Sequence, residues 1–348
     1  MAQKIIIDCD PGIDDALALV FAHGDPGLEV CGITTVAGNV GLDVTTANAL
    51  RVRDFIGMGD VPVVPGSTRP LLRPPLQARH VHGETGLGSA KLPEALSGPA
   101  PGHAVDFLVD TISAAPGEIT LIAVGPLTNI ALALRRESAL TSLVRDFVIM
   151  GGSAGRGNTT PAAEFNMLAD PEAAAIVFGA GWTVTMIGLD VTLQTRVTAA
   201  VRDRLRGLGR LAGDLLLPSL AGYRTIGPAD EGPAGEGRAD GGLADAGPAV
   251  PGGTRAPAGT GWPDDLIDPA VHDVCAVARV TSPGLISCAP ALVEVETTGR
   301  LTSGMTVTDF SAPPARHNAM VGTGIHVDGF WDLVLAAYQR VAAGMASQ

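Results

Sequence analysis

Short apolar runs alternate with longer amphipathic stretches along most of the chain. Short runs bounded by turn residues are typical of buried strands, whereas apolar residues that recur every three or four positions indicate helices. This pattern predicts strands at 4–10, 29–36, 63–64, 119–125, 145–151 and 183–190, and helices at 14–24, 43–57, 102–115, 126–136 and 170–180. The alternation predicts an α/β fold with a Rossmann-type core, in which helices flank both faces of a mainly parallel, open sheet.

The C-terminal part of the chain has a different pattern. Residues 285–310 predict a small antiparallel part with a Thr-Gly turn, and further helices are expected from His272 and at 328–343. At about 227–263 the chain is mostly Gly, Pro and Ala. So few apolar groups cannot offset the entropy of ordering, and we expect a flexible insertion there. Because the α/β pattern resumes after it, the insertion is expected to lie within a single domain that spans 1–348.

Composition and charge limit the kinds of molecule that the protein is expected to bind. The formal net charge of −13 argues against a nucleic-acid polymer, because phosphate binding needs a basic surface. The four cysteines form no C-x-x-C pair, which favours reduced thiols in a cytosol. We find neither a signal-peptide pattern at the start nor an apolar run that is long enough to cross a membrane. We therefore expect a cytoplasmic protein that binds small ligands.

Four carboxylates lie at the end of the first predicted strand and just after it, at Asp8, Asp10, Asp14 and Asp15. Ligands of open α/β sheets bind at the carboxyl ends of the strands, which is where these groups fall. Such closely spaced negative charges repel one another unless hydrogen bonds or a cation compensate. With no sulfur or imidazole pattern beside them, the expected ion is hard, Ca²⁺ or Mg²⁺.

More polar residues follow the other predicted strands or open a helix. They are Asn39, the segment 124–129, Met150, Asn158, Glu164, Asn166 and the pair His272-Asp273. Asn and Glu side chains together can donate to and accept from the hydroxyls of a sugar. A cluster of such groups around a metal would therefore suit a ligand rich in hydroxyls.

Five ordered motifs resemble those of the inosine–uridine-preferring nucleoside hydrolases. The segment 8–16, Asp-Cys-Asp-Pro-Gly-Ile-Asp-Asp-Ala, closely resembles the N-terminal signature of that family. The other matches are Gly38-Asn39, the Val-Gly-Pro-Leu-Thr-Asn segment at 124–129, the Pro-Ala-Ala-Glu-Phe-Asn segment at 161–166 and the Val-His-Asp-Val-Cys-Ala-Val segment at 271–277. A weaker match begins at His82. The resemblance covers most of the chain and implies the nucleoside hydrolase fold.

The resemblance implies hydrolysis of the N-glycosidic bond of ribonucleosides to free base and ribose. It implies a Ca²⁺ held by Asp10, Asp15, Asp273 and the carbonyl of Val124, with Asp10 as the base that activates the Ca²⁺-bound water. It places Asp14, Asn39, Asn158, Glu164 and Asn166 around the ribose, with Met150 beside it. It also implies that His272 protonates the departing base, and that the protein is a homodimer or homotetramer in nucleoside catabolism or salvage.

Several residues also have plainer explanations. Asp14 and Asp15 could serve only to stabilise the positive end of a helix, and Asp8 is expected to be structural. His82 lies in a loop that could close over a ligand or could simply be solvated. Tyr223 could stack on the nucleobase or pack between helices.

From the residues alone, two alternative functions from other protein classes remain open. An Asp-x-Asp strand end is also similar to that of the Mg²⁺-dependent haloacid-dehalogenase phosphatases, although Pro11-Gly12 replaces the usual Thr. The other alternative is a non-catalytic nucleoside-binding protein, which would bind nucleosides tightly without turnover.

Overall fold

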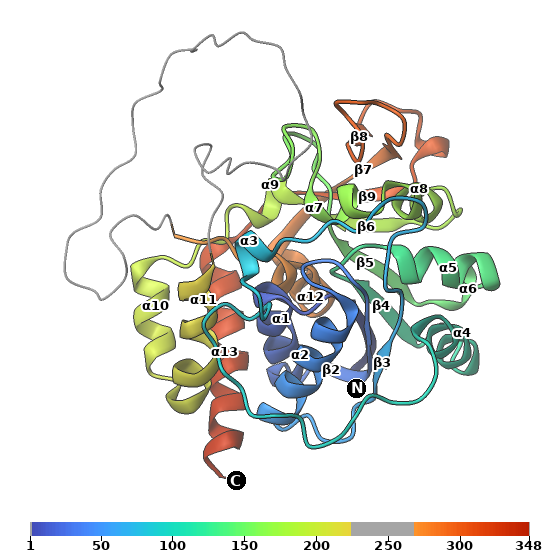
Figure 1. Cartoon of the computed structure of the whole chain (residues 1–348). Coiled ribbons are helices and arrows are strands. Elements are labelled where there is room, and N and C mark those ends of the chain that lie inside the picture. The colour runs from blue at the N-terminus through green and yellow to red at the C-terminus, as the bar shows by residue number, and fades with distance from the viewer. Residues whose placement is uncertain (1, 224–267, 348) are drawn as a thin grey trace, which may run out of the picture.

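The computed structural model describes residues 2–223 and 268–347, and a nine-stranded sheet runs through this part of the chain (Figure 1). Its order is β3 (Val63–Pro65), β2 (Leu28–Thr35), β1 (Gln3–Cys9), β4 (Ile119–Ala123), β5 (Asp146–Met150), β6 (Val184–Ile187), β9 (Ala319–Ile325), β7 (Ile286–Val295) and β8 (Thr306–Asp309). Neighbours from β3 to β9 are parallel, whereas β7 is antiparallel to both β9 and β8. The predicted parallel sheet with an antiparallel C-terminal part is confirmed.

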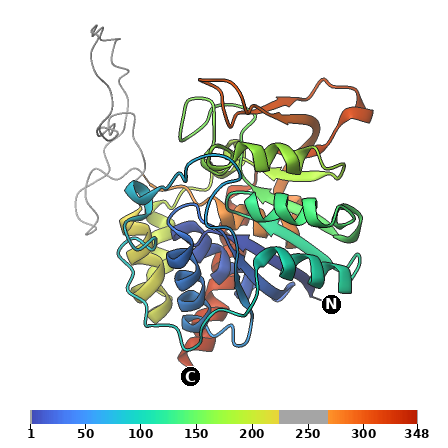
Figure 2. The ribbon, with the colours of Figure 1, turned by 45° about the vertical axis from the view of Figure 1, so that its right-hand side comes forward.

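Helices cover both faces of the sheet (Figure 2). One face packs against α1 (Ile13–Gly24), α2 (Leu42–Phe55), α12 (Asp273–Thr281) and α13 (Val327–Ala346). The other packs against α4 (Ala104–Ala114), α5 (Thr128–Arg136) and α8 (Pro171–Phe178). Shorter helices are α3 (Arg79–His82), α6 (Leu140–Leu143), α7 (Phe165–Ala169), α9 (Leu189–Thr192), α10 (Ala199–Arg206) and α11 (Leu217–Gly222), with a π-helix at Leu211–Leu216 and 3₁₀ turns at Pro283–Leu285 and Pro314–Arg316.

The first strand shows how the sequence pattern produces these layers. Ile5 and Ile7 point into the core under α1, and Ile6 points into the core on the opposite face. Successive side chains of a strand alternate between the two faces, so a strand covered on both sides is apolar throughout. Burying each isoleucine contributes roughly 1.5–3 kcal/mol. The apolar run thus places β1 in the middle of the sheet, with its carboxyl end beside those of β2 and β4.

Some predicted boundaries were wrong. The strand expected at 183–190 ends at Ile187, because Gly188 turns the chain into α9. The strand β9 was not predicted, since its Val-Gly-Thr-Gly stretch weakens the apolar pattern. The insertion expected at 227–263 lies outside the described residues, and the single-domain boundary stays a prediction. Among the described helices, we find none that combines the length and the apolar character needed to span a membrane.

Candidate active site

Parallel pairing brings the predicted site residues to one edge of the sheet. Asp10 follows β1, Asn39 follows β2, Val124 follows β4, and Met150 ends β5. The four strands are neighbours in the sheet, in the order β2, β1, β4 and β5, so their carboxyl ends lie next to each other. Asp273 is the first residue of α12, which packs on α1 and β5. Segments far apart in the chain therefore meet where ligands of open α/β sheets bind.

Asp10 is buried, and its two carboxylate oxygens differ. Oδ2 accepts a 2.6 Å hydrogen bond from the main-chain N–H of Asn39. Oδ1 is buried without a hydrogen-bond partner in the described part of the chain. Glycines wall the group in: a Cβ on Gly38 would collide with Oδ2, and one on Gly125 would lie 2.6 Å from Oδ1. One oxygen is thus held in place while the other is open to a ligand.

Asp15 stabilises the turn that carries Asp10. Its Oδ1 accepts from the N–H of Asp10 at 3.0 Å. Its Oδ2 accepts from the N–H of Gly12 at 3.0 Å and from Nδ2 of Asn39 at 3.2 Å. Asp15 therefore caps the start of α1, since its side chain binds main-chain amides there. A carboxylate has about four acceptor positions, so these bonds leave capacity for a cation.

Asp14 points to the part of the site formed by the later chain. Its Oδ2 accepts from the N–H of His272 at 3.3 Å and from the hydroxyl of Tyr223 at 3.4 Å. Its Oδ1 is another buried oxygen without a partner among residues 2–223 and 268–347. The ring of Tyr223 lies edge-on to that of His82, with 5.7 Å between centroids. The structure thus brings together four predicted site residues, Asp14, His82, Tyr223 and His272. Stacking of Tyr223 on the nucleobase stays a prediction.

The carboxylates lie close enough to shift one another's protonation. Burial raises the pKa of Asp14 to about 8, and the negative charge of Asp15 adds to the shift. Burial also raises the pKa of Asp10 and of Asp273 well above the usual range, and in both groups Asp15 contributes next. Glu164 acts on Asp273 as well. So many acidic groups cannot all be ionised in a buried site unless a cation compensates.

Two histidines complete the wall of the site, and both are neutral at pH 7. Burial lowers the pKa of His82 to about 3, and its Nδ1 accepts from the N–H of Ile13 at 3.2 Å. Burial lowers the pKa of His272 to about 4. Nδ1 of His272 lies 2.7 Å from the hydroxyl of Thr192, a partner that the sequence did not suggest. His82 is buried, so the solvated alternative is wrong.

The opposite wall is built around α7. Glu164 caps this helix, with Oε1 accepting from the N–H of Asn166 at 2.9 Å and Oε2 from that of Gly152 at 3.0 Å. Nδ2 of Asn166 donates to the carbonyls of Val124 at 2.9 Å and Met150 at 3.1 Å. Asn158 is different, because it is exposed in the preceding loop, where Oδ1 accepts from the N–H of Phe165 at 3.0 Å. It lies at the rim of the cluster.

The donors at this edge fit a hard divalent cation. Within residues 2–223 and 268–347, no three His, Cys, Asp or Glu side chains form a metal site by themselves. Asp15 and Oδ2 of Asp10 already hold amides. An ion here needs further oxygen donors, and the carbonyl of Val124 and ligand hydroxyls are of that type. The unpartnered Oδ1 of Asp10 and the crowded carboxylates favour such an ion.

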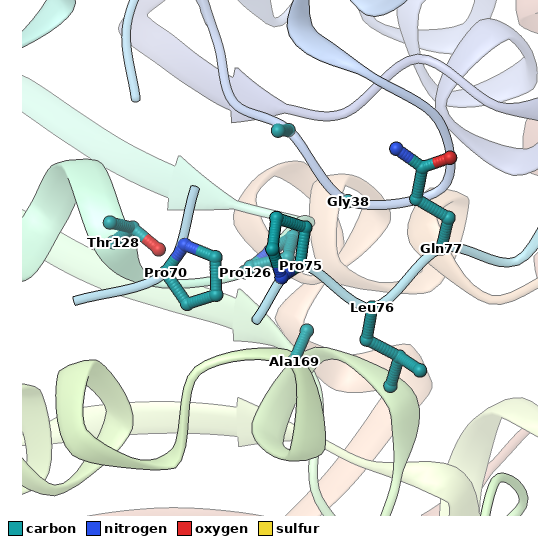
Figure 3. Close-up of a pocket in the computed structure, with 9 residues that line it drawn as sticks. Gly38, Pro70, Pro75, Leu76, Gln77, Pro126, Thr128 and Ala169 are labelled. Carbon is teal, nitrogen blue, oxygen red and sulfur yellow. The ribbon is translucent and has the colours of Figure 1, made fainter. Parts of the chain in front are cut away.

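A small cavity lies beside this cluster, behind Gly38 and Pro126 (Figure 3). Segment 70–77 covers it, and Thr128 and Ala169 line its other side. Its volume is about 10 Å³, roughly the minimum that holds one water molecule. A nucleoside does not fit there, so this cavity is not the substrate-binding site.

The fold and the acidic edge define an α/β protein with a site for a polar small molecule. The model of the inosine-uridine preferring nucleoside hydrolases matches residues 5–332, and the chain belongs to this family. A relative of that name from Leishmania major is 40% identical over 98% of this chain and 99% of its own. The pyrimidine-specific ribonucleoside hydrolase RihA of Salmonella schwarzengrund is 37% identical over 96% of this chain and 97% of its own.

Solved structures agree with this assignment. The purine-preferring ribonucleoside hydrolase of Gardnerella vaginalis superposes with a TM-score of 0.82 at 28% identity, over 98% of this chain and 99% of that one. The chain therefore is an N-ribohydrolase, which hydrolyses the N-glycosidic bond of ribonucleosides. This membership decides against the haloacid-dehalogenase phosphatase. The family is generally metal-dependent, in agreement with the donors found here.

Proposed function

We propose that Asp10 is the general base of this hydrolase and that the ion of the site is Ca²⁺. The observation that carries the proposal is the asymmetry of Asp10, whose Oδ2 is held by Asn39 while Oδ1 lies buried without a partner in the described residues. An oxygen in that state can accept a proton from an attacking water. A general base must be fixed within hydrogen-bond reach of the proton that it removes.

Asp10, Asp15, Asp273 and the carbonyl of Val124 would hold the ion. All are oxygen donors, which Ca²⁺ prefers, and Ca²⁺ tolerates an irregular arrangement better than Mg²⁺ does. When bound, Ca²⁺ neutralises the acidic cluster and orients the ribose diol and the attacking water. Asn166 supports this arrangement, because its Nδ2 bond to the carbonyl of Val124 fixes that oxygen.

The ribose would lie between the Asp14 side and the α7 side of the site. Asp14 offers its Oδ1, while Asn39, Glu164 and Asn166 surround the sugar, with Met150 beside it and Asn158 at the rim. Cleavage of the glycosidic bond passes through a state with positive charge on the sugar ring. Fixed carboxylates stabilise that charge without having to reorganise.

His272 would assist departure of the nucleobase, with His82 and Tyr223 on the same side. At its pKa of about 4 the imidazole is neutral at pH 7. It therefore acts as a neutral N–H donor. If the Thr192 hydroxyl donates to Nδ1, the proton lies on Nε2, from which it can reach the base.

The test is a panel of inosine, uridine, guanosine and cytidine, because relatives with different named preferences match the chain at similar identity. Base release is followed by HPLC with the protein as purified, after chelation, and after return of Ca²⁺ or Mg²⁺. We expect turnover that chelation abolishes and Ca²⁺ restores. Turnover that survives chelation, or that Mg²⁺ restores while Ca²⁺ does not, would contradict Ca²⁺ as the ion of the site. We further propose a cytoplasmic homodimer or homotetramer in nucleoside catabolism or salvage.

A further inference from the structure

One buried amide connects the strand ends that build the site. Asn129 lies at the start of α5 and is fully buried. Its Nδ2 donates to Oδ1 of Asp8 at 2.8 Å and to the carbonyl of Thr35 at 3.0 Å. Its Oδ1 accepts from the N–H of Ser67 at 2.9 Å. A single side chain thus joins β1, the end of β2 and the segment that follows β3.

From Asn129, one short route of hydrogen bonds leads to the Asp10 carboxylate. The carbonyl of Ser67 accepts from the N–H of Ala37 at 3.0 Å. Ala37 begins the turn whose Asn39 N–H holds Oδ2 of Asp10 at 2.6 Å. Asn129 therefore supports, through Ser67, the turn that fixes one oxygen of Asp10.

A second route leads to Val124. The carbonyl of Asp8, whose side chain Asn129 binds, accepts from the N–H of Val124 at 2.8 Å. Asn129 also lies on α5, which begins at Thr128, four residues after Val124. Val124 is thereby tied to Asn129 through Asp8 and through the chain itself.

The side chain of Asn129 has a single possible orientation. Nδ2 faces a carboxylate and a carbonyl, and Oδ1 faces an N–H, so exchanging the two ends of the amide would break all three bonds. A Cβ on Gly66 would collide with the amide, which shows how closely the backbone packs on it. The group therefore acts as a rigid spacer.

We propose that Asn129 is a positioning residue that sets the place of the Asp10 carboxylate relative to the Val124 carbonyl. The inference rests on the proposed function, in which these two groups hold the ion. Asn129 touches neither substrate nor ion. Removing it leaves the donors present but lets the strand ends move apart, which weakens ion binding and turnover. Losing such supporting hydrogen bonds typically costs about 10–100-fold in metal affinity or activity.

Asn318 supplies a matched control at the far part of the sheet. Its Nδ2 donates to the carbonyls of Phe178 and Val293 at 3.0 and 2.8 Å, and its Oδ1 accepts from the N–H of Val293 at 2.8 Å. Asn318→Ala therefore removes as many structural bonds as Asn129→Ala, next to β9 instead of the acidic edge.

The experiment measures the Ca²⁺ dissociation constant by calorimetry on protein that a chelator has freed of metal and from which the chelator has then been removed. Thermal unfolding and kcat are recorded for the same samples. We expect both variants to lower Tm. Only Asn129→Ala raises the Ca²⁺ dissociation constant and lowers kcat, each by about tenfold or more. An Asn129→Ala protein that loses Tm but keeps the dissociation constant and kcat of the wild type overturns the inference.

Two further outcomes keep the test decisive. If Asn129→Ala does not fold, Asn129→Ser, which retains a hydroxyl, is measured in the same way. An Asn129→Ser protein with the Ca²⁺ affinity and kcat of the wild type overturns the inference. If the wild-type protein binds no Ca²⁺, the proposed function fails, a result that is distinct from equal binding by wild type and variant.

Discussion

The main-chain N–H of Asn39 donates to Oδ2 of Asp10 at 2.6 Å, and this bond distinguishes the two oxygens of the carboxylate. Oδ1, buried and unpartnered within the described residues, is then the oxygen available for chemistry. Because the bond comes from the main chain, no side-chain change at Asn39 removes it directly. The glycine before Asn39 makes the approach possible, since a Cβ on Gly38 would occupy the position of Oδ2.

Replacing Asp10 separates its chemical role from its structural one. Asp10→Asn keeps an oxygen that can accept from Asn39 but loses the basic carboxylate. At saturating Ca²⁺ we expect kcat to fall by about 10²–10⁴-fold with a much smaller change in KM. The control is Asp25→Asn, since Asp25 is also buried but, among the described residues, its side chain binds the N–H of Gly27 and the hydroxyl of Thr281, away from the site. Turnover near the wild-type rate would remove Asp10 from the base role.

A methyl group at Gly38 tests the same geometry without removing any polar group. Gly38→Ala forces the turn away from Asp10, so we expect kcat to fall by at least about tenfold, since small misplacements of reacting groups are costly. Gly41→Ala is the matched control in the same turn, because within the described part of the chain its Cβ would meet Nε2 of Gln77 at 3.8 Å and nothing nearer. Steady-state kinetics compare the two variants, and equal effects in both would contradict the argument.

The crowded carboxylates predict an unusual pH dependence of stability. The pKa of Asp14 is about 8 in the folded protein and about 3.9 when unfolded. The folded state therefore binds more protons between these values, and this stabilisation is lost as the pH rises through 8. The pKa values of His82 and His272 are about 3 and 4, so above pH 7 they are neutral in both states.

We accordingly expect the chelated protein to lose Tm from pH 7 to pH 9. The increase in Tm that Ca²⁺ produces should grow over the same range, because the ion binds ionised carboxylates. Differential scanning fluorimetry in EGTA and in excess Ca²⁺ measures both trends. If the protein without metal becomes more stable toward pH 9, the buried carboxylates are ionised even in the absence of the ion.

The sugar side of the site predicts selectivity for ribose. Asp14 has a buried oxygen that lacks a partner in the described part of the chain, and a nucleoside hydroxyl would satisfy it. A substrate without that hydroxyl leaves the polar groups unpaired, so 2′-deoxyuridine should be cleaved with kcat/KM about 10⁴-fold below that of uridine. HPLC of matched ribo- and deoxynucleosides tests this, and equal rates would place Asp14 outside the sugar contacts.

Much of the fold could be predicted because its signals are local. The isoleucines of β1 and the helical spacing of α1 specify a strand and a helix within a few residues, whatever the rest of the chain does. The short helices α3, α7 and α9 were missed, since four or five residues look like turns. The strand β9 was missed because it is stabilised by pairing with β6 and β7 more than by its own composition.

The sequence alone determined which polar residues follow strands or open helices, and the resemblance of its motifs to a known family predicted that Asp10, Asn39, Val124 and Asp273 share one site. Only the tertiary structure decided how each is used: that Asp15 binds amides, that Asn39 holds one oxygen of Asp10, and that His272 meets Thr192, 80 positions away in the chain. Hydrogen bonds and pKa shifts depend on distances of a few ångströms between distant segments. Local patterns carry no information on such distances, because packing of the whole chain sets them.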